Sequence, residues 1–164
     1  MKTVWANQRL VVIACVLCMI AVGCQDNAVS TNLDIASNPD AKVLLALDYY
    51  EPMYKVDANG RATHLHMTWR HLPTPVLAEI GKLSELQWID FFGTTVTDDG
   101  LAQLVGLQKL TGLGLGGTPV TDQGLVHLAK LKSLQWLWLP KNRISQQAVE
   151  KLKEARPDLQ VYLI

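Results

Sequence analysis

The stretch Leu86-Gln87-Trp88-Ile89-Asp90-Phe91 decides how this chain folds, because it returns twice at a fixed interval. Residues 110–115 read LTGLGL and residues 134–139 read LQWLWL, so the first positions of the three copies are 24 residues apart. Weaker copies begin at Ala62 and, 25 residues after the third full copy, at Leu159. A fixed period of this size predicts a solenoid of stacked units rather than a closed globule with one cleft.

Within each repeat the apolar residues change from a two-residue period to a helical period. Each unit is therefore expected to be a strand followed by a helix of about two to three turns. Thr97, Thr121, Ser145 and the pair Thr74-Pro75 stand where these helices should begin and are expected to start or cap them. Because one unit cannot bury its apolar side alone, the units must stack. The sequence thus predicts an α/β solenoid, with a parallel sheet of about five strands on the concave side and helices on the convex side.

Residues 1–23 have the features of a secretory signal, and residues 24–38 those of a polar tether. Lys2 and Arg9 precede an apolar run from Leu10 to Val22. This run is too short to span a bilayer comfortably, since a membrane-spanning helix needs about 20 residues. Small residues lead to Cys24, which opens the polar segment. An ordinary signal peptide or an uncleaved N-terminal anchor are the alternatives.

Residues 39–61 predict a cap for the N-terminal end of the stack, and residues 62–164 the repeat domain. Val43, Leu44 and Leu47 recur at helical spacing within a helix expected over residues 39–50. Asn59-Gly60 between two extended runs then indicates a β-hairpin. Because the end of a solenoid exposes its core, such a cap is required.

Charge and cysteine content exclude several classes of function. The net charge of the 164-residue chain is zero, which gives no electrostatic evidence for nucleic-acid binding. All three cysteines lie within residues 1–24, so the rest of the chain has no thiol for a disulfide, a thiolate metal site or a nucleophile. We expect no cofactor and no metal.

The third, fifth and seventh positions of each strand should point outward on the concave side. In the last strand, counted from Leu159, these positions fall on Val161 and Leu163, while Tyr162 and Ile164 are expected in the core. The middle strand presents only glycines, and both neighbouring strands present aromatic residues. The glycines are Gly112, Gly114 and Gly116, flanked by Trp88 and Phe92 on one side and by Trp136 and Trp138 on the other.

Two interpretations of this glycine strand remain open. The flanking aromatic residues are roughly 10 Å apart, because neighbouring strands are about 4.8 Å apart, and they enclose a shallow groove. Such a groove suits a peptide segment, a sugar or a side chain of a partner. Alternatively, the aromatic side chains fold over the glycines and fill the gap themselves.

His64, His66 and Asp90 form a second candidate site on the same face. His66 and Asp90 are expected opposite each other on neighbouring strands, within hydrogen-bonding reach. Two His and one carboxylate can hold a metal or orient a base. However, no Ser or Cys nucleophile is nearby and a concave sheet does not exclude water, so a solvated His–Asp pair is favoured. We therefore expect that the protein is not an enzyme.

Residues 62–164 resemble leucine-rich repeats. The segments GGTPVTDQGL at 116–125 and FGTTVTDDGL at 92–101 are similar to the G-T-x-V-T-D-x-G-L repeats of bacterial proteins, which are related to the ribonuclease-inhibitor-like subclass. This resemblance implies a right-handed solenoid. It also implies that Thr94, Thr118 and Asn142 satisfy backbone groups of the loops.

The first repeat departs from the repeat pattern, and the N-terminal segment carries a second resemblance. The first repeat has Trp69 where the next two repeats have Gly, and Arg70 where they have Thr. Ala21-Val22-Gly23-Cys24 resembles the lipobox of bacterial lipoproteins, which implies cleavage before Cys24 and diacylation of its sulfur. Lipid chains on one residue would hold the mature protein on a membrane without spanning it.

Together these features favour a membrane-tethered module for protein–protein interaction in the bacterial cell envelope, periplasmic or facing the outer membrane. The expected contact surface is the concave face, made of Trp88, Asp90, Phe92, Gly112, Gly114, Gly116, Trp136 and Trp138. The alternative is a glycan or small-ligand receptor that uses the same aromatic groove. Which protein binds, which membrane carries the anchor and which oligomeric state forms are left open.

Overall fold

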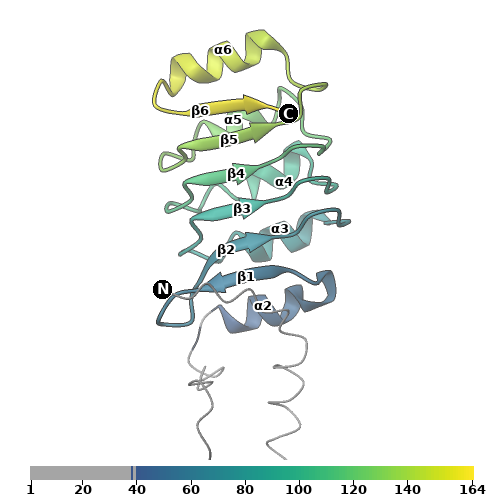
Figure 1. Cartoon of the computed structure of the whole chain (residues 1–164), viewed down its shortest axis with the longest axis vertical. Coiled ribbons are helices and arrows are strands. Elements are labelled where there is room, and N and C mark those ends of the chain that lie inside the picture. The colour runs from purple at the N-terminus through teal and green to yellow at the C-terminus, as the bar shows by residue number, and fades with distance from the viewer. Residues whose placement is uncertain (1–37, 39) are drawn as a thin grey trace, which may run out of the picture. The chain divides into compact units, whose positions relative to one another are not determined.

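The computed structural model describes residue 38 and residues 40–164. The signal segment, Cys24 and the tether up to residue 37 lie outside the described residues. Six strands form one sheet in chain order (Figure 1). They are β1 (Met53–Val56), β2 (Ala62–His66), β3 (Trp88–Asp90), β4 (Gly112–Gly114), β5 (Trp136–Leu139) and β6 (Gln160–Leu163). The β1–β2 pair is antiparallel and every other pair is parallel.

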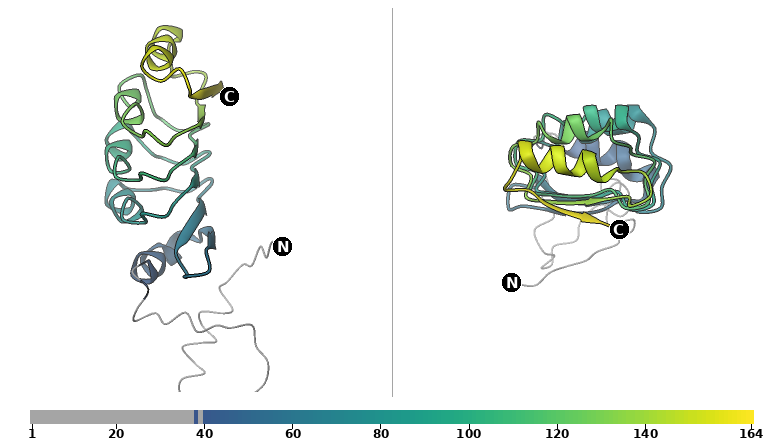
Figure 2. Two further views of the ribbon diagram at one scale, coloured as in Figure 1. Left: turned by 90° about the vertical axis from the view of Figure 1, so that its left-hand side faces the viewer. Right: turned by 90° about the horizontal axis from the view of Figure 1, so that it is seen from above.

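The helices lie together on one face of this sheet, which gives the two layers of a leucine-rich repeat solenoid (Figure 2). They are α2 (Ala41–Leu47), the short 3₁₀ helix η1 (Asp48–Tyr50), α3 (Thr74–Ile80), α4 (Asp98–Ala102), α5 (Leu125–Leu128) and α6 (Gln146–Ala155). The predicted fold class is confirmed: parallel strands alternate with helices at the repeat period. β1 adds an antiparallel strand to the five expected parallel ones.

The core consists of layers of apolar side chains, one from each repeat at the same position. Ile89, Leu113 and Leu137 occupy paired positions of β3, β4 and β5 and have no exposed surface. Burying a side chain of this size contributes about 1.5–3 kcal/mol relative to leaving it exposed. The repeated layer therefore both fixes the strand register and supplies much of the stability.

Helices α4 and α5 contain five and four residues, which is shorter than the two to three turns we predicted. Neighbouring repeats come into close contact at both of these helices. A Cβ at Gly100, within α4, would lie 2.3 Å from Cδ1 of Leu77 in α3. A Cβ at Gly124, just before α5, would lie 2.4 Å from Oδ1 of Asp98. Both glycines let the repeats approach each other, and turns replace the rest of each helix.

The residues before these helices join neighbouring repeats more than they cap helices. Ser145 caps α6 as predicted, because its Oγ accepts a hydrogen bond from the Ala148 amide at 3.1 Å. Thr97 precedes α4 but makes no side-chain cap bond. Instead, the Asp98 carboxylate accepts hydrogen bonds from the amide and hydroxyl of Thr121 in the next repeat, at 2.9 and 2.6 Å.

Asp122 repeats this arrangement one unit later. Its carboxylate accepts hydrogen bonds from the amide and hydroxyl of Ser145 at 2.8 and 2.7 Å. These bonds lower the pKa of Asp122. The Thr-Asp pairs of the repeat motif therefore tie consecutive units together along the edge where the helices begin.

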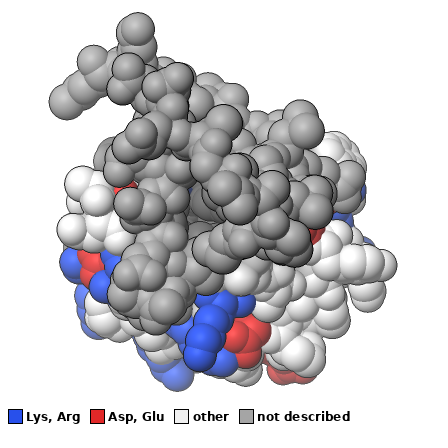
Figure 3. Space-filling model, turned by 90° about the horizontal axis from the view of Figure 1, so that it is seen from below, with Lys and Arg blue, Asp and Glu red and all other residues white. Residues whose placement is uncertain are grey.

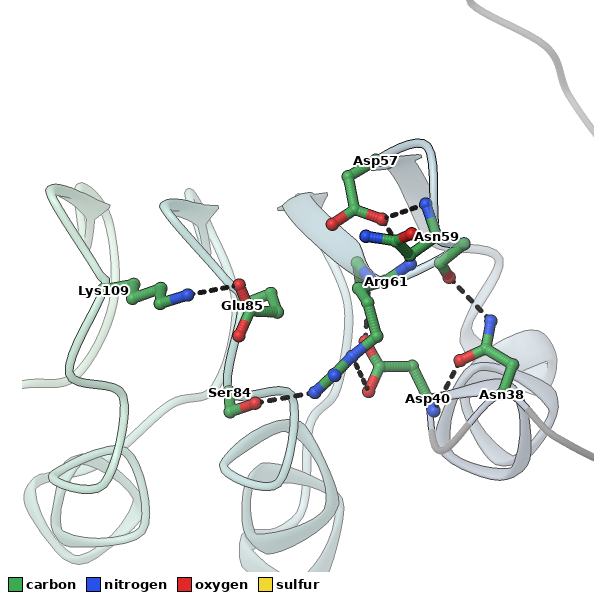
Figure 4. A network of polar contacts seen from close by, with 10 residues as sticks. Asn38, Asp40, Asp57, Asn59, Arg61, Ser84, Glu85 and Lys109 are labelled. Carbon is green, nitrogen blue, oxygen red and sulfur yellow. Dashed lines mark hydrogen bonds and ion pairs between the residues drawn. The ribbon is translucent and has the colours of Figure 1, made fainter.

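The N-terminal helix and hairpin are joined by buried polar side chains (Figure 4). The Asn38 amide donates to the Gly60 carbonyl at 2.7 Å, and Asp40, only 2% exposed, accepts from the Ala62 amide at 2.8 Å. The Arg61 Nε lies 3.5 Å from the Asp40 carboxylate. These contacts fix α2 against the start of β2, which is where the repeat stack begins.

The last strand has a different register from the one we predicted. Tyr162 lies opposite Trp138 and Leu163 opposite Leu139, so Tyr162 is on the concave face and Leu163 points toward the core side. Val161 also packs against the core. The prediction of Val161 and Leu163 on the concave face was wrong. The reason is that strand pairing returns to the 24-residue interval, while the extra residue is accommodated in the turn before β6.

That turn is organised by a buried arginine. Arg156 is 5% exposed and donates to the carbonyls of Leu131 and Leu134 at 2.6 and 2.7 Å. Its Nε and Nη2 also donate to the two carboxylate oxygens of Asp158, at 3.0 and 2.7 Å. This bidentate contact raises the pKa of the guanidinium. Arg156 therefore holds the end of α6 against the preceding repeat.

Candidate functional site

The side chain of Trp88 lies flat on the backbone of the glycine strand. A Cβ built at Gly112 would be 2.2 Å from Cε3 and 2.4 Å from Cζ3 of Trp88, so only glycine leaves room for the indole. The Trp88 ring reaches across β4 to Trp138, with 5.3 Å between the ring centroids. Trp138 in turn stacks on Tyr162, at 5.4 Å and an interplanar angle of 17°. Three rings thus form a continuous row from β3 to β6.

The other two glycines of this strand are also covered. A Cβ at Gly114 would meet Oδ1 of Asp90 at 2.6 Å. A Cβ at Gly116 would meet Cδ1 of Ile164 at 2.6 Å and Cδ2 of Phe92 at 2.8 Å. All three glycines are buried. Of the two interpretations of the strand, the structure therefore has the one in which neighbouring side chains fold over the glycines, and contact between a partner and the glycine backbone requires these side chains to move.

Part of the aromatic surface on the concave face is exposed to solvent. We call Trp88, Trp136, Trp138 and Tyr162 the aromatic platform. Trp88 and Trp138 are partly covered by their neighbours, whereas Trp136 is 39% exposed and Tyr162 is 44% exposed. Tyr162 was missed by sequence reasoning, because it enters the platform only through the corrected register of β6.

His66 and Asp90 lie opposite each other as predicted, with 3.7 Å between His66 Nδ1 and an oxygen of Asp90. The contact with His66 lowers the pKa of Asp90, and the carboxylate also accepts a hydrogen bond from the Phe92 amide at 3.0 Å. His64 does not join this pair, since its Nδ1 lies 3.1 Å from the hydroxyl of Thr63. Burial lowers the pKa of His64, as do the neighbouring charges of Lys55 and His66.

Within residue 38 and residues 40–164, no group of three or more His, Cys, Asp or Glu side chains is arranged to hold a metal ion. His66 pairs with Asp90, whereas His64 contacts Thr63 instead. Among the described helices, none is long and apolar enough to cross a membrane.

Trp69 is a second aromatic feature, at the loop end of β2. Its φ is +57°, in the left-handed region that Gly93 and Gly117 occupy at the equivalent positions of the next two repeats. The first loop therefore keeps the shape of the others although it has a tryptophan there. The Trp69 ring makes an edge contact with Phe92, at a centroid distance of 5.1 Å, and is 72% exposed.

The loops that follow β3 and β4 are held from inside by their threonines. The Thr94 hydroxyl donates to the Phe91 carbonyl at 2.8 Å, and the Thr118 hydroxyl donates to the Leu115 carbonyl at 2.7 Å. Both threonines are 2% exposed. Asn142, at the next equivalent position, is exposed instead, and the turn there begins one residue later, with the Arg143 amide on the Pro140 carbonyl.

Some of the exposed charged side chains are joined in ion pairs. Figure 3 shows Lys and Arg side chains next to Asp and Glu side chains at the N-terminal end of the solenoid. Among the described pairs, Arg70 contacts Glu51 at 2.8 Å, and Lys109 contacts Glu85 of the neighbouring repeat.

No family model matches the chain, and no curated protein matches it. Among solved structures it is similar to a leucine-rich repeat protein of Leptospira interrogans, with 27% identity and a TM-score of 0.40, over 55% of this chain and 21% of that one. It is also similar to an internalin of Listeria monocytogenes, with 19% identity and a TM-score of 0.49, over 76% of this chain and 35% of that one. The chain thus spans a fifth to about a third of the length of these proteins.

Proposed function

We propose that this chain is a non-enzymatic interaction module that binds a protein partner through its concave face. The observation that carries the proposal is the aromatic platform. Trp88, Trp138 and Tyr162 form an unbroken row of rings, and Trp136 lies beside it with 39% of its surface exposed. Trp and Tyr are enriched among the residues that contribute most to protein–protein binding. An exposed cluster of them on an open sheet favours a protein contact.

The platform is fixed in place before any partner arrives. Trp88 has room on β4 only because Gly112 has no side chain, and Trp138 is held between Trp88 and Tyr162. The strands beneath are joined to their neighbours by backbone hydrogen bonds at the repeat interval. Binding then costs little conformational entropy, because these side chains are already ordered.

The glycan alternative is weaker on this surface. A sugar stacks on an exposed face of an aromatic ring. Trp138 has Trp88 on one side and Tyr162 on the other, and one face of Trp88 lies on Gly112. These contacts cover one face of Trp88 and much of the ring surface of Trp138, which leaves less ring face for a flat pyranose ring than an unstacked tryptophan offers.

The proposal includes attachment to the bacterial cell envelope through lipid on Cys24. The support is the sequence alone: a basic and apolar N-terminal segment, small residues before Cys24, and a polar stretch after it. Membrane fractionation and mass spectrometry of the full chain and of Cys24→Ser test this part. Anchoring requires a lipid-sized mass increase on wild type and its loss, with release from membranes, in Cys24→Ser. Equal fractionation without added mass would contradict it.

Affinity capture from an envelope extract of the source bacterium tests the contact surface. The bait is the full chain, and the test variant is Trp136→Ala/Tyr162→Ala, which removes the two exposed members of the platform. The matched control is Val126→Ala, because Val126 is 62% exposed on α5, on the helical face. A protein held by wild type and control but lost by the test variant supports the proposal. Equal capture by all three would place the contact elsewhere.

A further inference from the structure

Trp69 differs from the platform residues in what it offers to solvent. A Cβ at Gly93 would lie 2.4 Å from Cε3 of Trp69, and 2.7 and 2.8 Å from the two adjoining ring atoms. These nearly equal distances place the Gly93 Cα beneath the face of the ring rather than at its edge. With 72% of the residue exposed, the opposite indole face is open to solvent.

The backbone at Trp69 is held in a conformation that a tryptophan does not favour. A left-handed φ costs an ordinary residue about 1–2 kcal/mol, and the next two repeats use glycine at this position. The conformation is imposed by hydrogen bonds from the Trp69 amide to the Phe92 carbonyl, at 2.8 Å, and from the Thr95 amide to the Arg70 carbonyl, at 3.3 Å. Strain retained at an exposed residue indicates a role other than stability.

The loop that carries Trp69 also presents polar side chains. Arg70 and Glu51 form an ion pair at 2.8 Å, and their side chains are 43% and 40% exposed. His71 is exposed and its Nδ1 lies 3.1 Å from the Thr95 hydroxyl. The loop thus combines one flat apolar surface with guanidinium, carboxylate, imidazole and hydroxyl groups, which donate to and accept from hydroxyl groups.

We propose that this loop, made of Trp69, Arg70 and His71 with Glu51 and Thr95, is a binding site for a saccharide. The ligand is a pyranose with equatorial hydroxyls, which has flat C–H faces. One such face stacks on the open face of Trp69, and the ring hydroxyls bond to the polar side chains around it. An apolar protein side chain would use the indole face but none of the polar groups of this loop. This site is separate from the aromatic platform and does not depend on the proposed function.

Titration of the full chain with cellotriose tests the inference, with mannitol as a polyol that has no ring face. The readout is the indole N–H resonance of Trp69, identified by its absence in Trp69→Gly. We expect a saturable shift with a dissociation constant on the order of 1 mM, typical of a small contact. Calorimetry should show binding about tenfold weaker or lost in Trp69→Gly and kept in Trp136→Ala.

Three results would overturn the inference: no saturable shift with cellotriose, the same shift with mannitol, or equal binding by Trp69→Gly. A photo-crosslinker at position 69 that captures a protein, while cellotriose leaves Trp69 unshifted, would assign the loop to a protein interface. Folding is checked by comparing Trp69→Gly with Trp69→Ala. Gly should melt at the higher temperature, because Ala must keep the left-handed φ. Failure of the platform variants in affinity capture would leave this result unaffected.

Discussion

The indole of Trp88 rests on the Cα of Gly112 and covers the backbone of the glycine strand there. A Cβ at Gly112 would lie 2.2 Å from the ring, which is closer than real Cβ contacts come. The glycines of β4 are therefore part of how the aromatic row is built. A chain with alanine there would have to lift Trp88 away from the sheet and from Trp138.

Gly112→Ala should lower the free energy of unfolding by about 1–3 kcal/mol, the usual cost of forcing extra volume into a packed site. Gly106→Ala is the matched control, because the nearest atom to a Cβ there is a backbone oxygen at 3.9 Å. Urea unfolding followed by tryptophan fluorescence measures both. Equal stability of the two variants would show that Trp88 does not depend on the missing side chain.

Asp98→Ala should destabilise the stack by about 1–2 kcal/mol, because the amide and hydroxyl of Thr121 lose a charged acceptor. The neighbouring Asp99 is exposed, and Asp99→Ala should change stability by no more than about 0.5 kcal/mol. Thermal unfolding of the two variants side by side checks this. If Asp99→Ala cost as much as Asp98→Ala, the effect would come from helix electrostatics instead of the bond between repeats.

Arg156→Leu should be the most destabilising of these changes, by about 3 kcal/mol, because two buried carbonyls and Asp158 lose their donor together. The exposed Arg143 provides the control, and Arg143→Leu should stay within about 0.5 kcal/mol of wild type. Hydrogen exchange should show early opening of α6 and β6 in Arg156→Leu. Unchanged protection there would mean that the turn is held by other contacts.

Stability should fall on acidification in two steps. Burial lowers the pKa of His64 below its usual 6.5. The unfolded chain therefore binds the imidazole proton more tightly than the folded chain does. Stability is lost as the pH falls from about 6.5 through the lowered pKa of the folded state. Asp90 has its pKa lowered from 3.8, so its contribution is lost only below that pH. In melting curves from pH 8 to 3, His64→Gln should remove the first step, and Asp90→Asn should make the second step smaller, because the pKa of Asp122 is lowered as well. A melting temperature that rises on acidification would contradict both.

The 24-residue period was sufficient to predict the core layers and the concave rows of β2 to β5, because alternation along a strand determines which residues point inward. Leu113 and Trp136 illustrate this, since one is buried and the other exposed as their positions require. The period does not determine how far a side chain leans over its neighbours, so the choice between an open and a closed glycine strand needed the positions of Trp88 and Trp138.

Two further features depended on local detail that a pattern does not contain. The place where the extra residue before Gln160 is absorbed decided whether Tyr162 faces the core or the platform. At Trp69, hydrogen bonds from the neighbouring loop impose a glycine-like backbone on a tryptophan. The departure from Gly at this position was visible in the sequence, but its exposure and strain were not.

Site-specific photo-crosslinking in cells of the source organism tests the central claim most directly, with the crosslinker placed once at Trp136 on the concave face and once at Val126 on the helical face. Trp136 is 39% exposed and Val126 is 62% exposed, so the control position is the more accessible of the two. The concave-face account predicts a discrete crosslinked protein from position 136 and none from position 126. The same product from both positions, or a product from position 126 alone, would contradict it.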